Sequence, residues 1–172
     1  KSISVSNIVN GTTRLQPVVL QIGTAAGTLA AIATRENISP SKVSVRQVQK
    51  AILDAGGYLL PYLDVPKTNK YFKTYQRIGA TGILKGEGRN VGWTNQTWLR
   101  TDTLLLSTEL DQLKEIYPNM TYQLPTDTVA LTINDAINMI ENIAMTHDIK
   151  AENIKVLVNH ILKDNKAIVY NN

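Results

Sequence analysis

Apolar and small side chains recur every three to four residues in six stretches of the chain, a spacing that places them on one face of a helix. Helices are therefore expected at about 17–35, 45–55, 68–80, 101–117, 132–146 and 151–163. Alternation of apolar and polar residues over 2–10 favours a short strand or an extended lead-in, and residues 167–170 favour a final short strand. The pattern predicts a mainly α fold, with small helical domains and short peripheral strands.

The first of these helices is unusually rich in glycine and alanine. Pro17 suits its first turn, and the small residues that share one face are Gly23, Ala26, Gly27, Ala30 and Ala31. Each glycine inside a helix costs about 1 kcal/mol relative to alanine, so a close approach by another backbone or by a ligand is expected in return. The stretch is short for a membrane span and its flanks are polar. We therefore expect a buried, closely packed helix of a soluble protein.

This stretch also resembles a known family. The run Thr13 to Pro17, followed by Gly23 to Gly27, is similar to the C-terminal end of FAD-dependent oxidoreductases of Bacteroidetes, many of them labelled xanthan lyase. The resemblance continues through Val43–Gln49 and covers about the first third of the chain. It implies that the helix N-terminus faces the flavin, where its amides and dipole suit an oxygen or a phosphate. It also implies a cofactor-binding set of Arg14, Leu15, Gln16, Pro17 and Gly23.

A flavoprotein of this kind needs a dinucleotide-binding fingerprint, Gly-x-Gly-x-x-Gly after a strand, which this sequence lacks. The chain is therefore expected to be a non-catalytic C-terminal piece of a larger enzyme. Its expected partner is an N-terminal flavin-binding domain that the sequence does not contain. FAD is expected in the full-length parent and not in this chain, and no catalytic residue is assigned.

The second half resembles S-layer homology repeats, with an expected domain boundary between 1–58 and 59–172 where Gly56-Gly57 ends a helix and the composition changes. Residues 63–65, 82–86 and 99–102 follow the layout of that motif, and residues 131–136 look like a second helix opening. Arg100 lacks the threonine that precedes it in the motif, so the cell-wall-binding cluster is incomplete. The resemblance implies a helical module and a periplasmic or extracellular location.

Composition and the distribution of charged residues argue against nucleic-acid binding and against a metal site. The net charge is +4, but the 18 Lys and Arg residues are scattered, so nucleic-acid binding is not expected. The densest basic and aromatic segment, 67–77, is better explained as a packed amphipathic helix that buries Phe72, Tyr75, Gln76 and Gly79. There is no cysteine, and the two histidines have no metal-ligand partner at helical spacing, so no metal site is expected.

Two tryptophans, Trp93 and Trp98, lie in an expected glycine-rich loop beside Asn95 and Gln96. They suit stacking on a sugar, although anchoring of the loop is the simpler explanation. The preferred interpretation is a C-terminal fragment of an FAD-dependent oxidoreductase. The alternative is a non-catalytic helical module that binds carbohydrate, cell wall or protein, or that self-associates.

Overall fold

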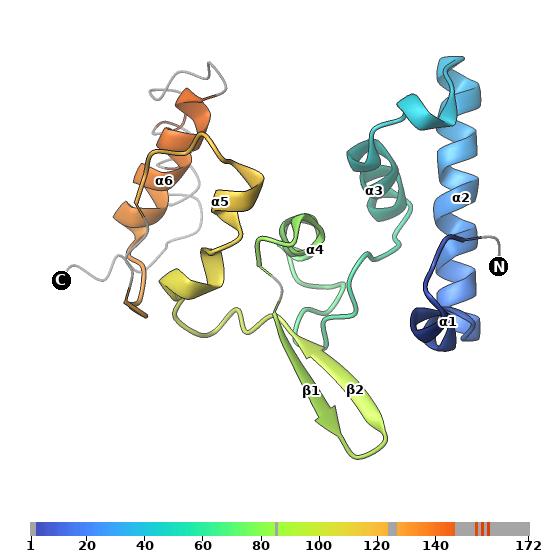
Figure 1. The fold of residues 1–172 in the computed structure, drawn as a ribbon, viewed down its shortest axis with the longest axis horizontal. Helices are drawn as coiled ribbons and strands as arrows, with labels where there is room; N and C mark the ends of the chain where they lie inside the picture. The colour runs from blue at the N-terminus through green and yellow to red at the C-terminus, as the bar shows by residue number, and fades with distance from the viewer. Residues whose placement is uncertain are drawn as a thin grey trace. The chain divides into compact units, whose positions relative to one another are not determined.

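The computed structural model describes residues 3–84, 86–123 and 127–146, together with 154, 156 and 158. The chain divides into two compact units, Lys1–Ala80 and Thr81–Asn172. Figure 1 shows the elements in chain order, which are α1 (Asn7–Thr13), α2 (Gln16–Glu36), α3 (Val45–Asp54), α4 (Phe72–Thr81), β1 (Glu87–Val91), β2 (Thr94–Trp98), α5 (Leu113–Ile116) and α6 (Ile133–Met145). Short 3-10 turns lie at Pro40–Lys42 and Ser107–Leu110. The mainly α class predicted from the pattern agrees with these elements.

The core of the first unit joins the C-terminal half of α2 to α3. Ile32, Ala33 and Val43 are buried there, and the partly buried side chains packed on them are Leu29, Ile38, Val48 and Ala51. Ser44 starts α3 with a capping box, because its hydroxyl accepts from Arg46 N while Gln47 accepts from Ser44 N. Both helices were predicted from the sequence pattern, at 17–35 and 45–55, whereas the cap at Ser44 was not.

The expectation of a buried α2 is wrong for this structure. Only Ile32 and Ala33 of its 21 residues are buried, and Leu20 is 71% exposed. A Cβ atom built at Gly23 or Gly27 would meet nothing within 4 Å in the described part of the chain, apart from the helix's own backbone. The reason is geometric, because α3 packs on the Leu29 side of α2 and leaves the small-residue face uncovered.

This open face predicts a gain in stability from alanine. Gly27→Ala is expected to stabilise the chain by up to about 1 kcal/mol, because alanine has the higher helix propensity and its methyl group meets no neighbour. Thermal unfolding of wild type and Gly27→Ala, followed by circular dichroism, measures the shift, with Gly23→Ala as a second site of the same kind. A lower melting temperature for both variants would show that another part of the protein packs closely on this face.

Helix α4 buries one face, as the amphipathic interpretation of segment 67–77 predicted. Gln76 is 1% exposed, and its side chain accepts from Leu59 N and Leu60 N at 2.6 and 2.8 Å and donates to Leu60 O at 2.9 Å. Gly79 is buried against Tyr62 and the side chain of Leu60. Helix α4 therefore holds the segment before it through one amide side chain and one glycine.

Ionic contacts tie α3 to α4 at the surface of the unit. Lys73 lies 2.8 Å from Asp54, and Lys50 of α3 also pairs with that carboxylate. Hydrogen bonds from Lys50 and then Lys73 lower the pKa of Asp54 to about 2, so the carboxylate stays ionised at neutral pH. Arg46 donates to Ala80 O at 3.2 Å. The unit thus continues to Ala80, whereas the boundary at 58/59, expected from Gly56-Gly57 and the change of composition, remains a prediction.

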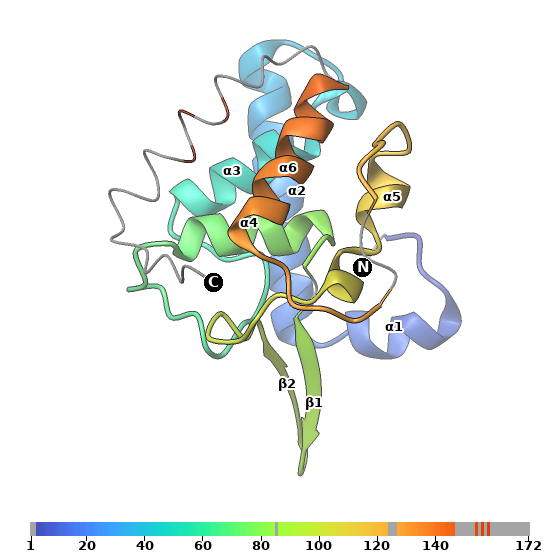
Figure 2. The ribbon, with the colours of Figure 1, turned by 90° about the vertical axis from the view of Figure 1, so that its left-hand side faces the viewer.

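In the second unit, β1 and β2 form an antiparallel hairpin that extends away from α5 and α6 (Figure 2). The expected glycine-rich loop around Trp93 and Trp98 is therefore wrong. The two-residue turn is Gly92-Trp93, and Gly92 has φ +57°, the left-handed value that a tight hairpin needs at its first turn position. Thr94, Thr97 and Trp98 beyond that glycine are of residue types enriched in strands, which favours pairing over a loop.

The continuous helix expected over 101–117 does not form. Leu105 O accepts from Leu131 N at 2.8 Å and Val129 O accepts from Ser107 N at 2.9 Å, so the chain around Leu106 runs extended beside residues 129–131. The helical part shrinks to Ser107–Leu110 and α5. Two leucines of the expected helix are nevertheless in the core, because Leu110 and Leu113 are buried together with Met139 of α6.

The remaining expectations divide into three groups. Helix α6 begins as expected, since Thr132 accepts from Asp135 N and Asp135 accepts from Thr132 N. The strand expected over 2–10 is wrong, because the Ser6 hydroxyl accepts from Val9 N and starts α1 instead. The expected strand at 167–170 and both histidines lie outside the described residues, as does the helix at 151–163 apart from Ile154, Val156 and Val158.

Candidate functional site

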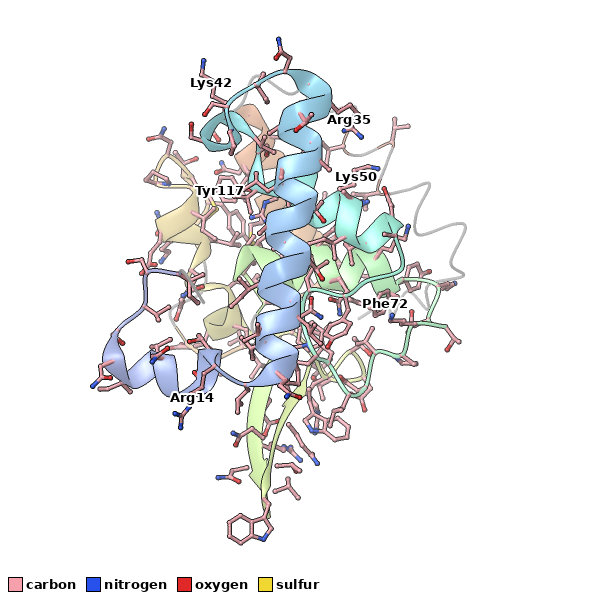
Figure 3. All side chains as sticks on the ribbon, turned by 90° about the vertical axis from the view of Figure 1, so that its right-hand side faces the viewer. Arg14, Arg35, Lys42, Lys50, Phe72 and Tyr117 are labelled. Carbon is pink, nitrogen blue, oxygen red and sulfur yellow. The ribbon has the colours of Figure 1, made fainter. Side chains whose placement is uncertain are left out.

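The site expected from the resemblance begins where α1 turns into α2. Arg14 has helical dihedral angles and closes α1, whereas Leu15 is extended (φ −64°, ψ 140°) and precedes the first turn of α2. Leu15 N donates to Thr12 O, and Leu15 O accepts from Val19 N at 3.0 Å. Pro17 lies in that first turn, where its missing amide hydrogen is no loss. Residues 14–17 thus form one fixed bend, which Figure 3 shows with the Arg14 side chain pointing away from the ribbon.

This bend presents an uncompensated helix N-terminus. No side chain caps α2, and its first turn contains no acidic residue. The first amides of a helix and its dipole attract negative charge. Arg14, Leu15, Gln16 and Pro17 are all exposed. The local charge is therefore positive and accessible, an arrangement that suits an anionic or electron-rich group.

Gly23 lies apart from the other four expected residues. It follows Gln16 by two helical turns, about 10 Å along the axis at 1.5 Å per residue. Because seven residues make almost two full turns, Gly23 is on the same side of α2 as Gln16. Gly23 is exposed, and the space beside it is open within the described part of the chain. The structure therefore groups residues 14–17 and places Gly23 further along one shared face.

The unit that carries this bend is strongly basic. Lys1–Ala80 contains ten Lys and Arg residues against three Asp and Glu, whereas Thr81–Asn172 contains eight against eleven. The first unit has Arg14 near one end of α2 and Arg35 near the other, as the labels in Figure 3 show. Such a balance raises the local concentration of anionic ligands around the first unit. The whole-chain value of +4 conceals this difference, so composition alone missed it.

Other candidate chemistry is limited. A shallow hollow lies at the opposite end of α2 and contains no acidic or basic side chain. Its lining residues are Ala30, Ala33, Thr34, Asn37, Ile38, Ser39 and Pro40. Among the residues that the structure describes, no three His, Asp or Glu side chains come together to hold a metal ion. The bend at residues 14–17 is therefore the stronger candidate for ligand binding.

A comparison with protein families bears on the segment that contains this bend. Residues 1–52 match the family model of FAD dependent oxidoreductases. The match covers α1, α2, the turn Pro40–Lys42 and most of α3, and it includes all five expected cofactor-binding residues. No curated protein and no solved structure matches the chain. The match supports the resemblance to FAD-dependent oxidoreductases, while the rest of the chain lies outside it.

The residues present fit the cofactor of that family by their chemistry. FAD carries a diphosphate and an electron-rich ring system, and the bend offers an uncapped helix N-terminus beside the Arg14 guanidinium. The small-residue face that continues from Gly23 leaves room for a close neighbour. By length and composition alone, the 21-residue helix α2 could cross a membrane, so the expectation that this stretch is short for a span is wrong. Core helices and signal sequences pass the same test.

At the tip of the hairpin, sequence reasoning singled out Trp93 and Asn95 but missed Asn90. Trp93 at the hairpin turn is fully exposed, at 105% of its reference area, and Asn90 faces Asn95 across the strands. Asn95 was singled out beside the tryptophans, but Asn90 was not. The signal was available, because Val91-Gly92-Trp93-Thr94 has the glycine of a two-residue turn, and pairing outward from it brings Asn90 to Asn95.

Proposed function

We propose that residues 1–52 are the cofactor-facing C-terminal segment of an FAD-dependent oxidoreductase, and that Arg14, Leu15, Gln16, Pro17 and Gly23 lie at its FAD. The single observation that carries this proposal is the family match over the segment that contains the uncapped start of α2. In this assignment the amides of the first turn of α2 and the Arg14 guanidinium bind and orient the cofactor. FAD would supply the redox chemistry, and this chain's own residues would position it.

The proposal also assigns the uncovered face of α2. The dinucleotide fingerprint is absent from the 172 residues, so the domain that binds the rest of the cofactor has to come from polypeptide outside them. That domain would cover the small-residue face, where glycines permit a backbone or a ligand to approach closely. Close packing in the parent enzyme would then offset the helix-propensity cost of Gly23 and Gly27. In the described part of this chain, the space beside both glycines is open.

A direct experiment is to express the reading frame from its upstream start through residue 172 and compare it with residues 1–172 alone. The longer protein is expected to purify with bound flavin, and the 172-residue chain is expected to bind none. Absorbance of flavin co-eluting with protein in gel filtration is the measurement. An upstream sequence without the fingerprint, or a yellow 172-residue chain, would contradict the proposal.

In the longer protein, Arg14→Ala is expected to weaken FAD retention by about tenfold, the effect of losing one charge-assisted contact. Arg35→Ala is the matched control, because Arg35 lies at the other end of the same helix and its contact is an exposed ion pair with Glu36. Dissociation of FAD on dilution, followed by flavin fluorescence, measures both variants. Equal losses from both would mean that the basic charge of the unit acts as a whole, without a specific role for Arg14.

We further propose that the second half is an accessory helical module resembling S-layer homology repeats, in a periplasmic or extracellular enzyme of the kind labelled xanthan lyase in Bacteroidetes. The helix opening at Thr132, with its capping box, supports this layout. The other expected opening, at Thr101-Asp102, is a turn, and Arg100 there has φ +60°. Fractionation of cells that produce the whole reading frame tests the location.

A further inference from the structure

We propose that the tip of the β1–β2 hairpin is a binding site for neutral carbohydrate, with Trp93 as the stacking platform and the amides of Asn90 and Asn95 as hydrogen-bonding groups. The family match ends at residue 52 and does not reach this hairpin. The proposal goes beyond the flavin assignment and does not depend on it.

The first observation is the position of Trp93. It occupies the second position of a two-residue turn and is 105% exposed, so no side chain among the described residues covers its indole. Trp98 of the same hairpin differs, because it is partly buried and its indole N–H donates to Gln96 at 3.1 Å. A fully exposed tryptophan leaves about the largest apolar side chain in water, a cost that a stacked ligand would offset.

The second observation is the pair of amides beside it. Asn90 and Asn95 lie directly opposite each other in the ladder, and both are exposed. Within the described residues, neither side-chain amide makes a hydrogen bond to the protein, whereas Gln96 on the other face of the hairpin is engaged by Trp98. Each free amide offers two donors and one acceptor, a set that matches pairs of neighbouring sugar hydroxyls.

The hairpin holds these groups in a fixed frame. Thr94 donates its hydroxyl to Val91 O at 2.9 Å across the turn. Five cross-strand pairs, from Glu87 with Trp98 to Val91 with Thr94, join β1 to β2 below the turn. Trp93 and Asn95 are two residues apart, so their Cα atoms are at most about 7 Å apart and a short oligosaccharide can reach both. The frame therefore reduces the ordering cost of binding.

The charge distribution decides the ligand class. The guanidinium of Arg89 is occupied by Glu87, and the hairpin 87–98 carries one acid and one base. The unit to which it belongs has more acidic than basic residues. RNA, DNA and anionic lipid bind through unpaired Lys and Arg, which this tip does not offer. A neutral sugar, which needs an aromatic face and amides but no counter-charge, fits best.

The experiment uses the full 172-residue chain and a panel of neutral polysaccharides, namely β-glucan, α-glucan, xylan, mannan and soluble chitin. Affinity electrophoresis is expected to show retardation by at least one of them, and Trp93→Ala is expected to weaken it by about tenfold or more. Val91→Ala is the matched control, because Val91 is half-exposed on the same hairpin and should leave retardation unchanged. Asn95→Ala should weaken binding while circular dichroism stays the same.

A second measurement reports the contact itself. The chain has two tryptophans, so the variant Trp98→Phe makes Trp93 the single indole, and its emission is expected to shift to shorter wavelength when the matching oligosaccharide is added. Retardation by none of the polysaccharides would overturn the proposal. So would equal retardation of Trp93→Ala, or an emission shift with anionic vesicles or single-stranded RNA and none with sugars.

Discussion

Replacing Gly79 with alanine is expected to destabilise the chain by about 1–3 kcal/mol, the usual range for overpacking a filled site. A Cβ atom at this position would collide with the hydroxyl of Tyr62 and with a methyl group of Leu60. Tyr62 is 7% exposed, so its ring has little room to withdraw. The strain is therefore expected to exceed the roughly 1 kcal/mol that alanine gains from helix propensity.

Urea unfolding of Gly79→Ala, followed by far-ultraviolet circular dichroism, gives the free energy. The matched control is Gly27→Ala, which makes the same chemical change in another helix, where no described residue touches the added methyl group. The two substitutions are expected to move stability in opposite directions. If both stabilise the chain, Tyr62 and Leu60 move aside at little cost, and Gly79 is not a packing requirement.

Gln76→Leu is expected to cost more than the 1–3 kcal/mol typical of one orphaned buried polar group, because three backbone groups lose their partner together. The amides of Leu59 and Leu60 share Gln76 Oε1 as acceptor, and Leu60 O takes its donor from the same side chain. Leucine has a similar volume, so the loss reports hydrogen bonding more than a cavity. At 1% exposure, Gln76 is a site where water cannot readily replace it.

Amide hydrogen exchange locates this effect. In the variant Gln76→Leu, the amides of Leu59 and Leu60 are expected to lose protection before those of α2. Thr74→Ala is the control on the exposed side of α4 and should change stability by no more than about 0.5 kcal/mol. Unchanged protection of Leu59 and Leu60 would mean that Gln76 is not what holds this segment, and that the packing around Tyr62 suffices.

At the candidate site, the sequence predicted the local structure correctly but not the burial, which depends on tertiary contacts. Pro17, the small residues after it and the resemblance were enough to locate the start of α2 and its five expected residues. They led to the wrong expectation of burial, because periodicity shows which residues share a face and not whether anything covers that face. The family match covers the segment, while the roles of Arg14 and Gly23 at the cofactor remain predictions.

The hairpin shows the opposite case. Its glycines were noticed as loop residues, and the pairing that makes Trp93 a turn residue was overlooked. The information was local, since one glycine at the first turn position defines the register of both strands. What sequence could not show is that Trp93 stays fully exposed, because exposure depends on where every other segment lies.

The sequence by itself determined the elements whose signals are contained within one turn of helix. These are the cap at Ser44, the cap at Thr132 and the buried face of α4, each set by side chains that contact their own backbone or by a local period of apolar residues. Tertiary structure decided the rest. Residues around Leu106 pair with residues 129–131 instead of extending a helix, since hydrogen bonds to this distant segment satisfy the same backbone groups. Likewise, the residues of α2 favour a helix, but whether that helix is buried depends on which other segments pack against it.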